Sequence, residues 1–322
     1  MKTQPRLSAA ALQFLRCPQC KSELLSAEEY CRCLNAQCQK VFPIVDGIPV
    51  LINEENSVFR LTDFTRKQDT YFDTSSGRQF RDKISDLLPG LDLNVRRGTN
   101  HRKFAELLLA KGKTPRVLVL GGAILGAGTE SLLAYPSIEL VETDIALGPR
   151  TGLICDAHDI PFSPETFDGV IAQAVLEHVV DPYRCVEEIH RVLKHDGLVY
   201  AETPFMQQVH GGQYDFTRFT QLGHRRLFRK FDELESGAVC GPGMALSWAY
   251  QYFLLSFTTS RSLRRVIHLF SRLTAFFLKY FDYFLIDRRG TLDAASGYYF
   301  LGRKTGNVLS DRELITLYRG AF

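Results

Sequence analysis

The sequence has little net charge and no long apolar segment. Its 39 Lys and Arg residues are nearly balanced by 36 Asp and Glu residues, which leaves a formal charge of +3. This balance provides no global electrostatic field that would favour nucleic acid. The apolar run Ala245–Phe257 is too short to span a membrane, because a span takes about 20 residues. The first six residues lack the apolar segment of a secretory signal, so we expect a cytoplasmic protein.

The sequence also lacks internal repeats and low-complexity tracts, and its composition is that of an ordinary globular protein. Of its 322 residues, 45% are hydrophobic and 23% are charged, which is enough apolar material for a core. The length suits one main domain with one or two smaller attachments. Five of the eight cysteines cluster near the N-terminus. This distribution favours a metal site in a reducing compartment over a disulfide framework.

The clustered cysteines predict a structural metal site. The first pair forms a C-x₂-C knuckle, and a second, looser pair follows it. Four thiolates in two close pairs suit the tetrahedral preference of zinc. Cys31 is an alternative to Cys33, and free cysteines that merely pack in the core are the simpler reading. The predicted ligands are Cys17, Cys20, Cys33 and Cys38.

The segment after these cysteines predicts a small β-hairpin. Two apolar runs within 41–51 are joined by Asp46 and Gly47, a strong signal for a tight turn. A module this small buries too little apolar surface to fold alone, so the metal would contribute much of its folding energy. We expect a zinc-ribbon module over 1–55 and a helical linker over 56–114. The helical patterns of the linker lie at 59–64, at 71–72 and at 101–110.

Short apolar runs then alternate with amphipathic segments up to Pro204. We expect strands at 116–120, 138–144, 153–155, 168–172 and 198–201, with a helix before the last of them that stops at Gly197. This alternation predicts an α/β fold with a parallel sheet covered on both faces. Ligands of such sheets bind beyond the carboxyl ends of the strands.

The predicted strand ends carry residues that suit a nucleoside. The first strand runs into a glycine-rich turn, where a ligand can approach the backbone closely, and Thr129 would open a helix behind it. The second strand ends on Asp144, whose carboxylate can accept hydrogen bonds from both ribose hydroxyls. Asp156 and Gln173 end the next two strands. A glycine turn alone could be only a tight connection, but four such elements in this order are a stronger signal.

Together these elements resemble a class I methyltransferase dependent on S-adenosylmethionine (SAM), of the type 11 family. The resemblance covers residues 115 to about 204. It implies a Rossmann-like, seven-stranded sheet with SAM as cofactor, with Asp156 and Ala157 at the adenine and Gln173 near the methionine part. The implied cofactor-binding residues are Gly121, Gly122, Gly126, Asp144, Asp156, Ala157 and Gln173.

The first motif departs from the family pattern. Val119 stands where the family usually has an acid, while Ala123 and Leu125 take glycine positions. These departures indicate a reshaped loop that uses Gly126 and Gly128, or weaker SAM binding. They also raise a rival hypothesis, a non-catalytic scaffold on a degenerate methyltransferase fold. The N-terminal module, in contrast, resembles the small zinc-ribbon proteins that activate tRNA and protein methyltransferases, and similar ribbons are fused to bacterial methyltransferases.

The segment 205–220 is a candidate substrate lid. It is dense in polar, titratable and aromatic residues and leaves the carboxyl end of a strand, where lids belong. His210 is the candidate catalytic base, because its unperturbed pKa lies near neutrality. Asp215 could orient His210 or replace it, or could form a structural ion pair with Arg218. His178 is a weaker candidate, which could instead hydrogen-bond at a helix start.

The C-terminal part predicts a helical cap over 236–290 and a last strand with a tail over 291–322. We expect one amphipathic helix at 266–285, preceded by three arginines. Such a helix could pack in the core or a dimer, or rest on an anionic membrane surface. Residues 298–304 read as the final strand of the methyltransferase sheet.

These observations lead to one main hypothesis. Residues 115–235 would form a SAM-binding core that moves a methyl group by direct SN2 transfer to an oxygen or nitrogen. The acceptor would be a small molecule, a glycan or a lipid, and 245–286 would offer peripheral contact with the inner membrane surface. Ribosomal or transfer RNA is the alternative acceptor, although the sequence has no basic, aromatic-interleaved run typical of an RNA-binding surface.

Overall fold

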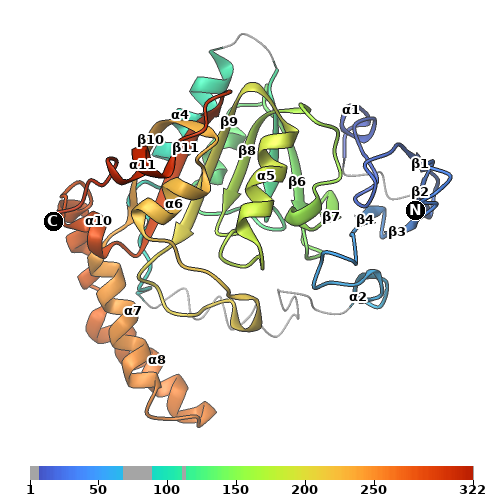
Figure 1. Cartoon of the computed structure of the whole chain (residues 1–322). Helices are drawn as coiled ribbons and strands as arrows, with labels where there is room; N and C mark the ends of the chain where they lie inside the picture. Colours follow the sequence, from blue (N-terminus) through green and yellow to red (C-terminus); the bar gives the residue numbers. More distant parts are fainter. Residues whose placement is uncertain (1–6, 68–88, 111–113, 322) are drawn as a thin grey trace.

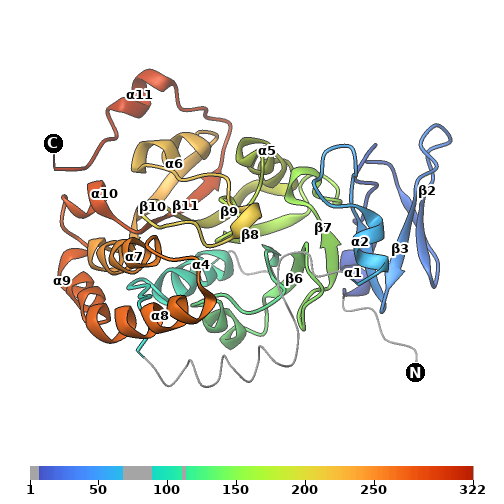
Figure 2. The same ribbon diagram turned by 90° about the horizontal axis from the view of Figure 1, so that it is seen from below.

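A mixed sheet runs through the whole molecule (Figures 1 and 2). The computed structural model describes residues 7–67, 89–110 and 114–321. Seven strands follow the order β7-β6-β5-β8-β9-β11-β10, which confirms the predicted Rossmann-like methyltransferase sheet. The first five are parallel, and β11 lies antiparallel between β9 and β10. The strands are β5 (Arg116–Leu120), β6 (Glu139–Asp144), β7 (Leu153–Cys155), β8 (Phe167–Gln173), β9 (Leu193–Pro204), β10 (Phe231–Cys240) and β11 (Gly297–Lys304).

Helices cover both faces of this sheet, as expected for continuous apolar strands. On one face, α4 (Thr99–Leu109) packs Phe104 and Leu108 under β5 and β9. On the other face, α5 (Pro182–Val192) buries an apolar stripe that includes Val186 and Ile189. The two helices lie on opposite sides of the sheet in Figure 2. The short helix α6 (Gln221–Leu227) follows the lid segment on the α5 side.

The N-terminal module continues this sheet instead of forming a separate lobe. Its strands β1 (Leu24–Ser26), β2 (Tyr30–Cys33), β3 (Val41–Val45) and β4 (Ile48–Leu51) are antiparallel to one another. Strand β4 then pairs in parallel with β7, so the module adds a further strand to the edge of the core. Asp46 and Gly47 form the predicted hairpin turn, with φ of 51° and 79°. Two short helices, α1 (Ala9–Leu12) and α2 (Leu61–Thr65), flank the module.

Two predicted helical features were wrong in detail. The helix before β9 ends at Val192 and not near Gly197, because the next residue, Leu193, is fully buried and pairs with Phe167 of β8. The segment opened by Thr129 is only a six-residue 3-10 helix, η1 (Thr129–Ala134). The helical pattern expected at 71–72 lies outside the described residues.

The boundary expected between 235 and 236 falls inside a strand. Ser236 and the residues after it continue β10, where Ala238 and Val239 are buried and the strand pairs with β11. Strand β11 itself confirms the predicted final strand. A short helix, α11 (Asp311–Ile315), lies in the C-terminal tail.

The expected single helix over 266–285 was also wrong. Helix α8 (Arg261–Ala275) ends early, and the chain continues through η4 (Leu278–Phe281), α9 (Asp282–Leu285) and α10 (Thr291–Ala294). The break allows the buried Asp282 to accept hydrogen bonds from the N–H groups of Gly243 and Met244. These N–H groups begin α7 (Pro242–Leu255), so Asp282 caps α7 and holds the chain against it.

Candidate active site

A cavity opens at the carboxyl ends of β5, β6, β7 and β8. Its volume is about 730 Å³, including the part open to solvent. Main-chain and side-chain atoms of Gly121, Asp144, Asp156 and Ala157 line it. This is the edge of a parallel sheet where a ligand is expected. The remaining lining residues are Val58, Phe59, Leu120, Thr143, Ile145, Cys155, His158, Ala174, Val175, His178, Val179 and Val180.

The glycine loop approaches the cavity through Gly121. This residue has a φ of +72°, and a Cβ there would lie 2.6 Å from Cγ2 of Val175. A larger residue would therefore be strained and would clash with the opposite wall of the cavity. Gly121 thus keeps the floor of the cavity open between β5 and β8.

Asp144 is buried at the end of β6 and organises the turn around it. Its carboxylate accepts hydrogen bonds from the N–H groups of Ala123 and Ala146, each at 2.9 Å. Burial raises the pKa of Asp144 to about 6, although these backbone hydrogen bonds lower it in part. Each carboxylate oxygen has a second lone pair, so a ribose hydroxyl could also donate to it. Asp144 therefore connects the glycine loop with the wall of the cavity.

Asp156 lies in a more polar environment than Asp144. It accepts hydrogen bonds from His158 Nδ1 at 2.5 Å, from the His158 N–H at 3.0 Å and from Ser57 Oγ at 2.5 Å. Burial alone would raise the pKa of Asp156, but these hydrogen bonds outweigh it and the pKa is lowered. Asp156 is therefore an ionised acceptor that faces the cavity at neutral pH.

The segment after β4 forms part of the cavity wall, which the sequence did not indicate. Val58 and Phe59 line the cavity, and Phe59 lies 5.3 Å from the ring of Tyr214 in the lid segment. Asn53 and Asn56 donate hydrogen bonds to Asp159 at 2.9 and 3.0 Å. No motif marks these residues, and only the pairing of β4 with β7 places them at the site.

Three of the expected cofactor residues lie behind the cavity. Gly122 donates its N–H to the Thr143 carbonyl, and Gly126 packs against the side chain of Gln173. The amide of Gln173 donates to the Ala127 carbonyl at 2.8 Å and to Glu202 at 2.9 Å. In this arrangement these residues fix the shape of the glycine loop, and they are absent from the cavity lining.

The unusual residues of the glycine loop do not fill the cavity. Val119 is buried within β5, and Ala123 is buried beneath Gly148. Leu125 is 38% exposed. None of these three side chains lines the cavity, so they do not occupy the space that a ligand would fill.

The lid segment is held by an ion pair between Asp215 and Arg218. One guanidinium nitrogen, NH1, donates to Asp215 Oδ1, and the other, NH2, donates to Oδ2 at 2.9 Å. The N–H groups of His210 and Gly211 also donate to Oδ2, at 2.8 and 3.1 Å. Burial alone would raise the pKa of Asp215, but these partners hold it well below its usual range. This geometry fits a positioning role for Asp215 better than that of a base.

A group of two histidines and one glutamate lies between the cavity and the lid. Glu177 Oε1 is 3.7 Å from His178 Nε2 and 3.9 Å from His210 Nε2. Glu177 is 1% exposed, and burial raises its pKa to about 8. Burial lowers the pKa of His178, which lines the cavity, because burial disfavours the charged form of either group. The sequence analysis did not select Glu177, although it stands directly before His178.

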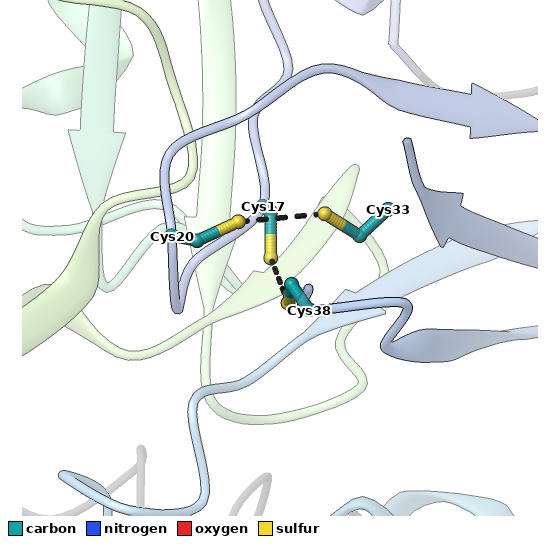
Figure 3. A group of neighbouring side chains, drawn as sticks. All are labelled: Cys17, Cys20, Cys33 and Cys38. Carbon is teal, nitrogen blue, oxygen red and sulfur yellow. Dashed lines mark hydrogen bonds between the residues drawn. The ribbon is translucent and has the colours of Figure 1, made fainter. Parts of the chain in front are cut away.

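The four expected metal ligands meet in the N-terminal module (Figure 3). Cys17 Sγ lies 3.8 Å from Cys38 Sγ, and Cys20 Sγ lies 3.4 Å from Cys33 Sγ. All four sulfur atoms lie within 4.8 Å of one another, a spacing compatible with metal binding. Cys31 instead places its sulfur 3.5 Å from Ser26 Oγ, so the group contains Cys33 and not Cys31.

Comparison with known proteins adds a family match over the core. Residues 126–201 match the type 11 family model, described as a methyltransferase domain. Over 58 residues the chain is 41% identical to the mitochondrial arginine-hydroxylase NDUFAF5 of Rattus norvegicus. That stretch covers 18% of this chain and only 16% of the relative.

Solved methyltransferase structures resemble the chain at low identity. The 1,6-didemethyltoxoflavin-N1-methyltransferase of Burkholderia thailandensis is 15% identical, with a TM-score of 0.40, over 88% of this chain and 100% of that one. The phosphoethanolamine N-methyltransferase 2 of Haemonchus contortus is also 15% identical, with a TM-score of 0.36, over 63% of this chain and 52% of that one. The family match covers Asp144, Asp156 and the parallel strands β6 to β8. Residues 126–201 therefore match a methyltransferase domain of the type 11 family, and the match covers about a quarter of the chain.

Proposed function

We propose that this chain is a SAM-dependent methyltransferase that acts on an oxygen or nitrogen of a lipid-type acceptor. The observation that carries the proposal is the cavity at the ends of β5 to β8, with Asp144 and Asp156 buried in its wall. Fold alone would not establish an activity. Two carboxylates at successive strand ends, however, match the two polar edges of an adenosine.

The cavity residues fit the cofactor by chemistry. Asp144 would accept the ribose hydroxyls, Asp156 the exocyclic amine of adenine, and the N–H of Ala157 would face a ring nitrogen. Apolar walls from Phe59 and Val179 would enclose the base and exclude water. When bound, SAM supplies a sulfonium methyl group for direct SN2 transfer.

The acceptor would enter from the lid side of the cavity. His178 connects the two sides, because it lines the cavity and its ring lies 5.1 Å from that of His210. His210 is our candidate to receive the proton of the acceptor, and Asp215 would position His210. Methyl transfer also requires the acceptor atom to be held in line with the methyl group, a task that suits the lid.

A lipid-type acceptor is supported by the surface of α7, α8 and the short helices η4 and α9 that follow them. Helix α8 packs through its small and polar side, where Gln251 donates to Ser271 at 2.8 Å and Ala275 is buried. Its apolar stripe points outward, so of the three readings of this segment the core of this chain is excluded, and a dimer contact or a membrane surface is left. We call this surface the apolar face. It consists of Phe253, Phe257, Val266, Leu269, Phe270, Leu273, Phe277, Phe281 and Phe284, which are 43% to 77% exposed.

The charge around the apolar face favours an anionic membrane as its partner. No acidic residue occurs between Glu235 and Asp282, and Arg261 and Arg265 are exposed on α8. The α7–α8 pair also projects from the body of the molecule (Figure 1). Soluble monomers rarely expose so large an apolar surface, and a basic amphipathic helix can lie in the interface of a bilayer. Within the described residues, no helix is both long and apolar enough to cross a membrane.

We therefore propose peripheral contact with an anionic membrane, such as the cytoplasmic face of the inner membrane. Sedimentation with phosphatidylglycerol vesicles should deplete the protein from solution, whereas phosphatidylcholine vesicles should bind it weakly. If the protein binds neither kind of vesicle and forms a dimer in sedimentation velocity, the apolar face is instead covered by a second copy of the chain.

The activity itself can be tested with [methyl-³H]SAM. The purified, zinc-replete protein should transfer label to the lipid fraction of a cell extract, and not to total RNA or to the water-soluble fraction. Label in RNA would favour the alternative acceptor. SAM binding without transfer to any fraction would favour the non-catalytic scaffold.

A further inference from the structure

The group formed by Glu177, His178 and His210 has the geometry of a metal site. Its three ligand atoms lie within 4.8 Å of one another. The two distances to Glu177 Oε1, 3.7 and 3.9 Å, are too long for hydrogen bonds. Ligands bonded to one ion at about 2.1 Å with tetrahedral angles lie about 3.4 Å apart. Side-chain shifts of a few tenths of an ångström would therefore bring Glu177 to this separation from either histidine, and the ligand atoms of the two histidines lie within 4.8 Å of each other.

The hydrogen bonds of both imidazoles favour the tautomer that a metal requires. His178 Nδ1 lies 2.7 Å from the carbonyl oxygen of Tyr214, and His210 Nδ1 lies 3.2 Å from that of Gln208. A carbonyl only accepts, so Nδ1 of His178 carries the proton and its Nε2 keeps a lone pair. His210 Nδ1 lies closer to the Gln208 carbonyl, at 3.2 Å, than to the donor Nη2 of Arg218, at 3.5 Å, which favours the same tautomer there. Metal-bound histidines are commonly oriented in this way, through the N–H of the other ring nitrogen.

Glu177 provides a second, independent observation. Its Oε2 is buried and has no hydrogen-bond partner among the described residues. The nearby cation Arg218 is already held by both oxygens of Asp215. A buried carboxylate is costly unless it is paired or coordinates a metal, and a cation between the three groups would provide that partner.

We propose that Glu177, His178 and His210 bind a divalent transition-metal ion. Two imidazoles and one carboxylate suit Fe(II), Mn(II) or Zn(II), and three protein ligands leave coordination positions open. His178 lies on the wall of the cofactor cavity, so an open position could hold an oxygen atom of the acceptor beside the methyl donor. That role rests on the proposed methyltransferase function, whereas ion binding itself does not.

The site can be tested by titrating the full chain, loaded with one zinc per molecule for its four thiolates and freed of further metal, with Mn(II) and following the EPR signal of the free ion. Zinc-loaded thiolates would not exchange for Mn(II), because soft ligands disfavour it. The proposal predicts one Mn(II) per chain, with at least tenfold weaker binding in His210→Ala and in Glu177→Gln. His195→Ala is the matched control, since His195 is exposed and remote from the site, and it should bind Mn(II) as the native chain does.

Calorimetry with SAM on the same samples separates the two proposals. His210 is on the exposed lid, so His210→Ala should fold and retain native SAM affinity while it loses Mn(II). A native protein that binds SAM but neither Mn(II) nor Co(II) would overturn the metal site alone, as would unchanged Mn(II) affinity in both variants. A native protein that binds Mn(II) but not SAM would overturn the proposed function and leave the metal site standing.

Discussion

The two ends of the sheet carry attachments of opposite character. At one edge, the cysteine-rich module pairs β4 with β7 and places Val58 and Phe59 in the wall of the cofactor cavity. Beyond the other edge strand, β10, the α7–α8 pair projects from the body and exposes its apolar face (Figures 1 and 2). From the sequence, both regions were expected to be accessory modules. The structure joins one to the proposed cofactor site and leaves the other with its apolar side chains toward solvent.

This difference predicts which property of the protein each attachment influences. The N-terminal module packs apolar side chains such as Val50 against the core, beside Ile154. It also contacts the core through polar groups such as Lys21, which pairs with Glu188 at 3.0 Å and Asp159 at 3.6 Å. A substitution that disrupts this module should therefore weaken cofactor binding. A substitution in the apolar face should weaken only binding to the partner that covers this face.

The largest expected effect is on the cysteine module. We propose that the four thiolates hold a structural zinc ion. Cys17→Ser should then remove one thiolate, release the zinc and loosen β4, because structural zinc supplies much of the folding energy of such modules. We expect SAM affinity to fall more than tenfold and the melting temperature to drop by several degrees. Atomic absorption and calorimetry would measure both.

Cys31→Ser is the matched control, since Cys31 is a neighbouring cysteine outside the group of four. It should retain one zinc per chain. If Cys17→Ser lost zinc but bound SAM normally, the module would be independent of the cofactor site, and the comparison between the two ends would fail.

The second effect concerns pH. Because burial raises the pKa of Asp144 to about 6, protonation on acidification would remove the ribose acceptor. SAM affinity should therefore be constant above neutrality and should fall about tenfold between pH 7 and pH 5. Asp144→Asn should bind weakly at both pH values. A flat profile for the native protein would show that Asp144 does not bind the cofactor in its ionised form.

A comparable effect, on a different property, is expected at the apolar face. The double variant Phe270→Ser with Leu273→Ser should weaken binding to anionic vesicles at least tenfold, because each buried side chain of this type contributes about 1.5–3 kcal/mol. SAM affinity and melting temperature should stay native, since both residues are exposed. Leu34→Ser, which changes an exposed leucine of the cysteine module, is the control and should bind vesicles normally.

The smallest effect is expected in the lid. Asp215→Asn would weaken the ion pair with Arg218 and loosen the backbone around His210. We expect turnover to fall roughly two- to tenfold through poorer positioning, with SAM affinity unchanged. A change of SAM affinity instead would mean that the lid also shapes the cofactor cavity.

Periodicity and turn chemistry predicted most of the core. The strands around Asp144 and Asp156 and the Asp46-Gly47 hairpin follow from local patterns, and the structure confirms them. Local patterns could not show the pairing of β4 with β7, which depends on residues about 100 positions apart. For the same reason they did not place Ser57 against Asp156.

Helix α8 shows a second limit of sequence reasoning. The apolar stripe of α8 is visible in the sequence, but the pattern does not determine which face of the helix packs against the rest of the protein. The predicted helix ends at Ala275, before the buried Asp282 that hydrogen-bonds to the start of α7, and Ser271 rather than Phe270 faces α7. Glu177 was overlooked because its burial and its distance to His210 arise only after the lid folds over it.

Calorimetry of SAM binding tests the central claim most directly. The zinc-replete native chain should bind SAM and S-adenosylhomocysteine with micromolar affinity, and Asp156→Ala, which removes the carboxylate held by Ser57 and His158, should lose that binding while remaining folded. If the folded native chain binds neither ligand, the cavity is not a cofactor site, and the non-catalytic scaffold becomes the better account of this protein.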